Sequence, residues 1–91
     1  MKECCCSPQG SYRHLIVIQV KHRSLSAPRA QEILTEHGCQ IKVRLGIHED
    51  EPDHGLIMVL AEGTKGNVKE MITSLSELPE VSVTSMEVPR P

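Results

Sequence analysis

A strand–helix–strand pattern that occurs twice is the sequence feature that most constrains the fold of this chain. In the first copy the apolar run 14–20 and the strand 41–45 flank a helical stretch, and in the second copy the runs 56–60 and 81–84 do so. Two such units predict an α+β fold, a ferredoxin-like βαββαβ sandwich in which a four-stranded antiparallel sheet carries two helices on one face. Many unrelated functions occur on this fold, so the function has to be argued from a site.

The length and composition predict one small domain that would benefit from a partner. We place a single domain at 13–88, with a tail at 1–12 and another at 89–91. The core has to be aliphatic, because the sequence has no Trp, no Phe and a single Tyr. A chain of this size buries only about 60–65% of the surface that its unfolded form exposes. Pairing with a second subunit would relieve that shortage.

Capping residues bound the two predicted helices. Ser26 is the predicted N-cap of the first helix, and Gly38 is the residue expected to close it. Thr64 is predicted to cap the second helix, which Pro79 stops. Each helix carries an apolar stripe with a spacing of three or four residues. The first stripe comprises Ala27, Ala30, Ile33, Leu34 and His37, and the second comprises Val68, Met71, Ile72, Leu75 and Leu78.

The strand patterns predict a sheet with one face left open. The segments 13–21 and 55–62 are apolar on both faces and are expected to be the central pair. The segment 40–47 alternates strictly, which is typical of an edge strand with one buried face. Two helices cover only one face of a four-stranded sheet, and an uncovered apolar face of that size marks an interface. We therefore expect a dimer or a larger homo-oligomer, formed by sheet-to-sheet packing or by edge pairing.

The charge distribution argues against a nucleic-acid-binding protein. Residues 1–46 carry seven Lys or Arg and three acids, whereas 47–91 carry three and nine, and no basic stripe collects on one element. No apolar run approaches the length of a membrane span, and the N-terminus lacks the apolar stretch of a signal peptide. We therefore expect no direct contact with nucleic acid or membrane, a cytoplasmic location and reduced cysteines.

The loop before the first helix is a candidate anion site. His22, Arg23 and Ser24 follow a central strand and precede a helix N-terminus, where backbone N–H groups and the helix dipole favour negative charge. A plain capped loop explains the same residues, because the glycines of phosphate-binding loops are missing.

The edge around Arg44, Gly46 and His48 is the second candidate for ligand binding. Arg44 is expected to point away from the helices, toward the interface, where it would pair with a carboxylate of a partner or ligand. Gly46 leaves room for close backbone approach. An edge-strand Arg that lies in water is the alternative.

Histidines that flank an acidic turn are the candidate metal ligands. His48 and His54 enclose four carboxylates, and His22 is a further candidate ligand for nickel, zinc or iron. A solvated turn is the plainer interpretation, because nothing fixes a closed ligand set. The run Cys4-Cys5-Cys6 lacks C-x-x-C spacing, so we predict no metal and no cofactor there.

The sequence offers no catalytic set, and we predict that the chain is not an enzyme. The spacing of its Ser, Cys, His and Asp residues suggests no nucleophile–base grouping. Cys39 is expected to pack as a small hydrophobic residue.

Four segments resemble a known family. They are Glu32–Gly38, Arg44–Glu49, Gly55–Ile57 and Leu75–Val83, and the likeness covers about 13–88. Together they resemble the small ACT-like proteins that are named as regulators of the iron-only hydrogenase system. The resemblance implies a ferredoxin-like, ACT-like fold that assembles into dimers or tetramers. Amino-acid-sensing ACT domains and the sensor domain of the nickel-responsive repressor share that architecture.

The chain departs from the ligand motifs of those relatives. The loop Lys21–Arg29 has neither the Asp nor the Pro-Gly pair of amino-acid-binding ACT domains, and the close His-x-His of the nickel sensor is absent. Glu80 stands where a glycine is common in the resembled family. The leading hypothesis is a non-enzymatic, oligomeric regulatory domain that binds a small ligand or a partner protein at a subunit interface. A metal-responsive sensor module and a small dimeric ferredoxin-like enzyme are the alternatives.

Overall fold

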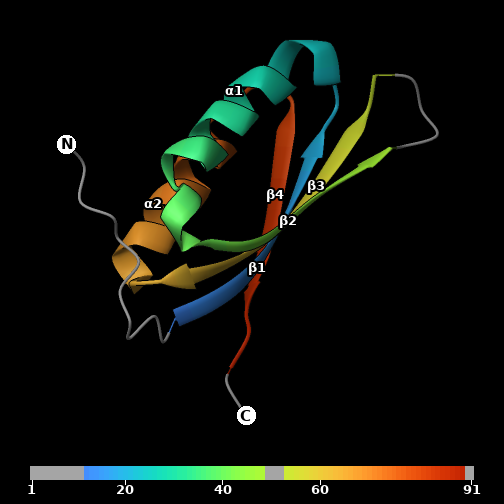
Figure 1. The fold of residues 1–91 in the computed structure, drawn as a ribbon. Helices are drawn as coiled ribbons and strands as arrows, with labels where there is room; N and C mark the ends of the chain where they lie inside the picture. Colours follow the sequence, from blue (N-terminus) through green and yellow to red (C-terminus); the bar gives the residue numbers. More distant parts are fainter. Residues whose placement is uncertain (1–11, 49–52, 90–91) are drawn as a thin grey trace.

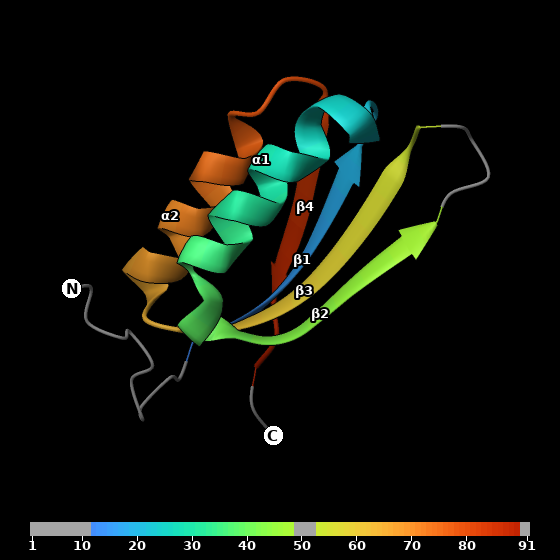
Figure 2. The same ribbon diagram turned by 45° about the horizontal axis from the view of Figure 1, so that its top comes forward.

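The computed structural model describes residues 12–48 and 53–89, which form two repeated strand–helix–strand units. The elements in chain order are β1 (Tyr12–Val20), α1 (Arg23–Glu36), the 3-10 turn η1 (Gly38–Gln40), β2 (Ile41–His48), β3 (Gly55–Gly63), α2 (Lys65–Ser76) and β4 (Val81–Glu87). The strands pair in the antiparallel order β2-β3-β1-β4, and both helices lie on the same face of the sheet (Figures 1 and 2). The predicted α+β, ferredoxin-like sandwich and its central pair of strands are confirmed. Of the predicted tails 1–12 and 89–91, residues 1–11 and 90–91 lie outside the described residues, as does the run Cys4-Cys5-Cys6.

The core lies between the two helices and the face of the sheet that they cover. On β1 and β3 every second residue points toward the helices, which is the side-chain period of a strand. The helices contribute the predicted apolar stripes, of which Ala30, Leu34 and Met71 are fully buried. The remaining core residues are Ile16, Ile18, Val20, Ile33, Ile57, Val59, Ala61, Val68 and Leu75. None of the described helices is long and apolar enough to cross a membrane.

The helix ends agree with prediction at α2 and differ at α1. The Thr64 side chain accepts a hydrogen bond from the Asn67 backbone N–H at 3.2 Å, which is the predicted N-cap. Ser26 is wrong as an N-cap, because α1 begins at Arg23 and Ser26 lies buried inside it. Gly38 does not close α1 in a left-handed conformation, because the chain continues there into a 3-10 turn without positive φ.

A register shift in β2 corrects the predicted orientation of this strand. Ile41 is paired with the core residue Ala61, whereas Val43 is paired with Leu60, so a bulge interrupts the alternation between Ile41 and Val43. Ile41 therefore packs against the core, and the residues that follow it change faces. β2 is the predicted edge strand, but its apolar face is not buried against the helices.

The face of the sheet opposite the helices is apolar and uncovered, as predicted. Leu45 and Met86 are 53% and 59% exposed there, and the neighbouring side chains from the central strands are half-buried. Strand pairing places on this face Leu15, Val17, Val43, Leu45, Ile47, Leu56, Met58, Leu60 and Met86, which we call the open face.

Candidate functional site

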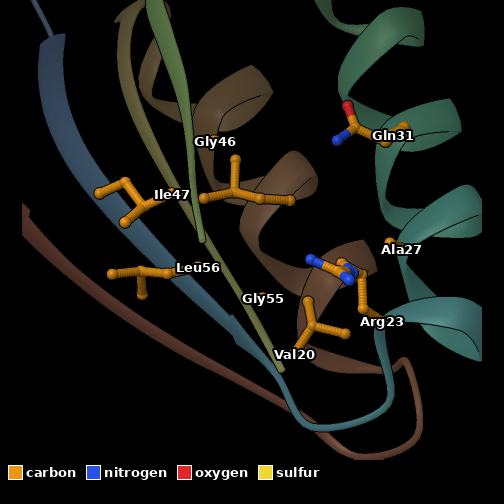
Figure 3. Close-up of a pocket in the computed structure, with 9 residues that line it drawn as sticks. Val20, Arg23, Ala27, Gln31, Gly46, Ile47, Gly55 and Leu56 are labelled. Carbon is orange, nitrogen blue, oxygen red and sulfur yellow. The ribbon is translucent and has the colours of Figure 1, made fainter. Parts of the chain in front are cut away.

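A largely apolar groove lies between α1 and the β2–β3 ribbon (Figure 3). Its volume is about 230 Å³, and apolar atoms make up most of its wall. Two long polar side chains face it, Arg23 from the first turn of α1 and Gln31 two turns further along the helix. The lining residues are Val20, Arg23, Ala27, Gln31, Gly46, Ile47, Gly55, Leu56 and Ile57. Such a cavity combines an apolar floor with a few polar groups, as small-molecule sites do.

Two glycines line the groove, and they differ in the space beside them. A Cβ atom added at Gly46 would meet nothing within 4 Å, so the groove has free space directly above this part of β2. A Cβ atom at Gly55 would lie 3.4 Å from Cδ of Arg23, so the aliphatic stem of Arg23 lies across the bare backbone of Gly55. Gly46 therefore has free space beside it, and the predicted close backbone approach there stays a prediction.

Arg44 lies on the helix side of the sheet, so its predicted direction is wrong. The bulge in β2 pairs Arg44 with the core residue Val59 and turns its side chain toward α1. There Nη2 of Arg44 donates a hydrogen bond to Oε1 of Gln31. This contact places Arg44 beside the amide of Gln31 at the wall of the groove.

The head of α1 is capped by Asp53, a residue distant in sequence. Its carboxylate accepts hydrogen bonds from the Ser24 N–H at 3.0 Å and from the Ser24 Oγ at 3.1 Å. Its carbonyl oxygen accepts the Arg23 N–H at 2.6 Å. Nδ1 of His22, the N-cap residue, lies 3.9 Å from Oδ2 of Asp53. A carboxylate of the chain itself therefore occupies the place at the helix N-terminus where an anion was expected.

These contacts change the acidity of Asp53. The hydrogen bond from the Ser24 N–H is the largest cause that lowers the pKa of this carboxyl below its ordinary value of 3.8, and the Ser24 hydroxyl and the charges of His22 and Arg23 lower it further. The carboxylate therefore stays ionised at neutral pH. Of the three residues predicted in this loop, His22 and Ser24 lie at the Asp53 cap, and Arg23 reaches the groove.

Of the histidines predicted as metal ligands, His22 lies beside Asp53, whereas His54 lies in another cavity. His54 lines a polar cavity of about 400 Å³ that adjoins the groove at Val20 and Gly55 and also includes Lys21 and Glu80. Within residues 12–48 and 53–89 no group of three His, Cys, Asp or Glu side chains is placed to hold a metal ion. The structure does not describe the side chain of His48 or residues 49–52. The metal site at His48 and His54 therefore stays a prediction. Cys39 is half-buried in η1.

The sequence reasoning did not identify Gln31, Asp53 and Gly55 as parts of the site. Gln31 shares one side of α1 with Arg23 and Ala27, and this spacing of four residues was a signal that could have found it. Gly55 begins an apolar strand, where a glycine often marks a close approach of other groups. The position of Asp53 against α1 depends on tertiary structure, and no local pattern indicates it.

Comparison with known proteins gives one family and several similar folds. A family model described as "TM1266-like: Iron-only hydrogenase system regulator, putative" matches residues 13–85. The solved structure of uncharacterized protein TM1266 from Thermotoga maritima is 17% identical, with a TM-score of 0.78, over 84% of this chain and 95% of that chain. The C-terminal domain of the MgtC protein from Mycobacterium tuberculosis is 10% identical, with a TM-score of 0.69, over 92% of this chain and 95% of that chain. At these identities the two structures show a shared fold.

One further solved structure is weakly similar to this chain. CPII from Thiomonas intermedia K12, a nitrogen regulatory PII-like protein, is 21% identical over 88% of this chain and 94% of that chain, with a TM-score of only 0.45. No curated protein matches this sequence.

Proposed function

Because the chain belongs to the TM1266-like family of iron-only hydrogenase system regulators, we propose that it is a non-enzymatic regulatory domain that assembles with itself and binds a small ligand beside the subunit interface. One observation carries the proposal: the groove and the open face occupy opposite sides of the same two strands. The backbones of Ile47 and Leu56 line the groove, while their side chains point away from α1 toward the open face (Figure 3).

The open face supports assembly with a second copy of the chain. Apolar side chains from all four strands adjoin one another there, and exposed apolar patches of this extent mark interaction surfaces. Among the described residues, Gln19, Ser82 and Thr84 interrupt the face on its β1–β4 side, and the paired Arg13 and Glu62 lie at one end of it. The β2–β3 half is therefore the more apolar half and is the proposed centre of the interface. Each Å² of apolar surface that is buried there contributes about 25 cal/mol.

The chemistry of the groove supports a ligand with an apolar body and one anionic group. The guanidinium of Arg23 offers a planar set of donors, which suits a carboxylate or phosphate. The amide of Gln31, which Arg44 contacts, offers a second polar contact about two helical turns away. Val20 and Ile57 supply the apolar surface between these two ends. We propose Arg23 and Gly46 as the ligand-binding residues of the predicted set, with Arg44 in a supporting position.

The remaining elements of the proposal rest on the family and the sequence. The name of the family supports a regulatory role and no reaction. The single domain at 13–88 and the cytoplasmic location remain predictions from the sequence. A protein partner in place of the small ligand is compatible with the same groove, which is open along one side.

A thermal melt with candidate ligands tests the proposal. Small monocarboxylates and divalent metals are added to the wild type, to Arg23→Met and to Arg29→Met. Arg29 is the matched control, because it lies on α1 and pairs with Glu32 away from the groove. A ligand at a hundredfold over its Kd stabilises the folded state by about 2.7 kcal/mol. The proposal expects a shift with an anionic ligand that Arg23→Met loses and Arg29→Met keeps. A shift with metal alone would favour the metal-responsive alternative and contradict the proposal.

A further inference from the structure

His14 is a polar side chain at a core position of β1. The next three residues that point to the helices from this strand are Ile16, Ile18 and Val20, all of them buried and aliphatic. His14 is only 8% exposed, and its Nδ1 has no hydrogen-bond partner among the described residues. A buried nitrogen of this kind ordinarily contacts a protein group or an ordered small molecule, because an unsatisfied one costs free energy. The buried Nδ1 of His14 therefore points to a ligand that contacts it.

This histidine lines a polar cavity at the edge of the sheet opposite the groove. The cavity has a volume of about 360 Å³ and lies between α2 and the β1–β4 pair. The Tyr12 ring stacks on the His14 ring with centroids 4.9 Å apart and forms part of the same wall. The lining residues are Tyr12, His14, Lys69, Ile72, Thr73 and Ser85. Three elements thus bring hydroxyl, ammonium and imidazole groups to one place.

The charges around the cavity favour an anion. Lys69 lines it, and Nζ of Lys65 lies 5.9 Å from the centroid of the Tyr12 ring at its border. Glu87 is the opposing charge, because it is paired with His14 across β1 and β4, and its side chain is exposed. Two ammonium groups against one solvated carboxylate leave a net positive surrounding. The hydroxyls of Thr73 and Ser85 add two further donors for the oxygens of a ligand.

We propose that this cavity is a second ligand site, which binds a tetrahedral oxyanion of the phosphate type through His14 and Lys69. A phosphate group matches the site because its several oxygens accept from donors that approach from α2, β4 and β1. A protonated phosphate oxygen also donates to a neutral imidazole nitrogen, whereas sulfate has only acceptors. Free phosphate and a phosphomonoester share this chemistry. The site does not depend on the groove, since the two cavities share no residue.

The ring resonances of His14 provide a direct test. The folded protein is titrated with inorganic phosphate, glycerol phosphate, sulfate and chloride at constant ionic strength while the histidine Cε1–H and Cδ2–H signals are followed by NMR. We expect phosphate to move the His14 signals with saturation and chloride to leave them in place. A stronger response to glycerol phosphate than to inorganic phosphate would assign the site to a phosphomonoester, and the reverse to the free ion. The ring signals that are missing from the spectrum of His14→Phe are those of His14.

Substitutions on the surface keep the test independent of folding. Lys69→Met should weaken phosphate binding about tenfold, the loss of one charge-assisted contact. Lys42→Met is the matched control, because Lys42 is an exposed lysine of β2 that pairs with Glu62. Glu87→Gln should strengthen binding, because it removes the opposing carboxylate. Phosphate titrations that leave the His14 signals in place, or that move them equally in Lys69→Met and wild type, would overturn the proposal without touching the groove.

Discussion

The carboxylate of Asp53 caps α1 by accepting two hydrogen bonds from Ser24, at 3.0 Å from its N–H and 3.1 Å from its Oγ. Ser24 is the second residue of α1, and the N-cap residue His22 makes no capping bond of its own. Asp53, which lies just before β3, thus caps α1 in place of the local Ser, Thr, Asp or Asn that caps most helices. The contact ties α1 to the segment before β3, at the end of the groove where Arg23 lies.

The Asp53 cap predicts a pH-dependent contribution to stability. Because the pKa of Asp53 is lower in the folded state than its ordinary value of 3.8, the cap stabilises the fold above that value and loses its effect as the pH falls through the lower, folded value. Asp53→Asn keeps an acceptor oxygen and tolerates the positive φ of 65° but carries no charge. We expect wild type to unfold at higher urea than Asp53→Asn at neutral pH and the difference to shrink below pH 3.8. A difference that stays constant down to the acid limit would contradict the cap.

Ser26 provides a second prediction about stability. Its buried Oγ donates to the carbonyl oxygen of Pro79 at 3.0 Å, which joins α1 to the turn before β4. Ser26→Ala should lower the free energy of unfolding by about 1 kcal/mol, because it leaves that carbonyl without its donor. Thr35→Ala is the control, since the exposed Thr35 hydroxyl bonds only to the Gln31 carbonyl within its own helix. Equal urea midpoints for the two variants would argue against the Ser26 contact.

The Thr64 cap gives a third prediction. Thr64→Ala removes the acceptor for the Asn67 N–H and should cost about 1 kcal/mol of stability. Thr64→Ser retains a hydroxyl in the same place and should unfold close to the wild type. Chemical denaturation of the three proteins measures both effects. A serine variant as unstable as the alanine variant would assign the effect to the lost methyl group instead of the cap.

The space above Gly46 allows the groove to be filled without breaking the fold. Gly46→Val places a strand-forming side chain where a Cβ meets nothing within 4 Å, so stability should rise by about 0.5–1 kcal/mol. The added isopropyl group should at the same time abolish the thermal shift caused by any ligand of the groove. Gly46→Ala, which adds a single methyl group, should retain a weaker shift. Ligand shifts that survive in Gly46→Val would place the ligand elsewhere.

The sequence patterns were sufficient for the fold because they repeat along the whole chain. Two apolar strands, two helical stripes and the Thr64 cap all indicate the same βαββαβ sandwich, and such agreement between levels makes a fold predictable. The uncovered apolar face follows from the same patterns, because Leu15 and Met58 alternate with core residues on strands that the helices cover on one side only.

The site was less predictable because its geometry depends on two non-local features. The bulge in β2 moves Arg44 to the helix side and leaves Leu45 on the open face, although the sequence alternates without interruption there. A single extra residue in a strand moves every later side chain of that strand to the opposite face of the sheet. No residue type in this segment indicates such a bulge. The cap on α1 comes from Asp53, which lies 29 positions beyond Ser24. Local capping rules therefore favoured Ser26.

Sedimentation equilibrium of the wild type against Leu45→Glu tests the central claim, assembly through the open face, most directly. Leu45 is 53% exposed near the proposed centre of that face, and Leu25, at 70% exposed in the first turn of α1, is a matched apolar control outside it. We predict that the wild type and Leu25→Glu form the same dimer or larger oligomer and that Leu45→Glu sediments as a folded monomer. A monomeric wild type, or a Leu45→Glu variant that assembles like the wild type, would contradict the account.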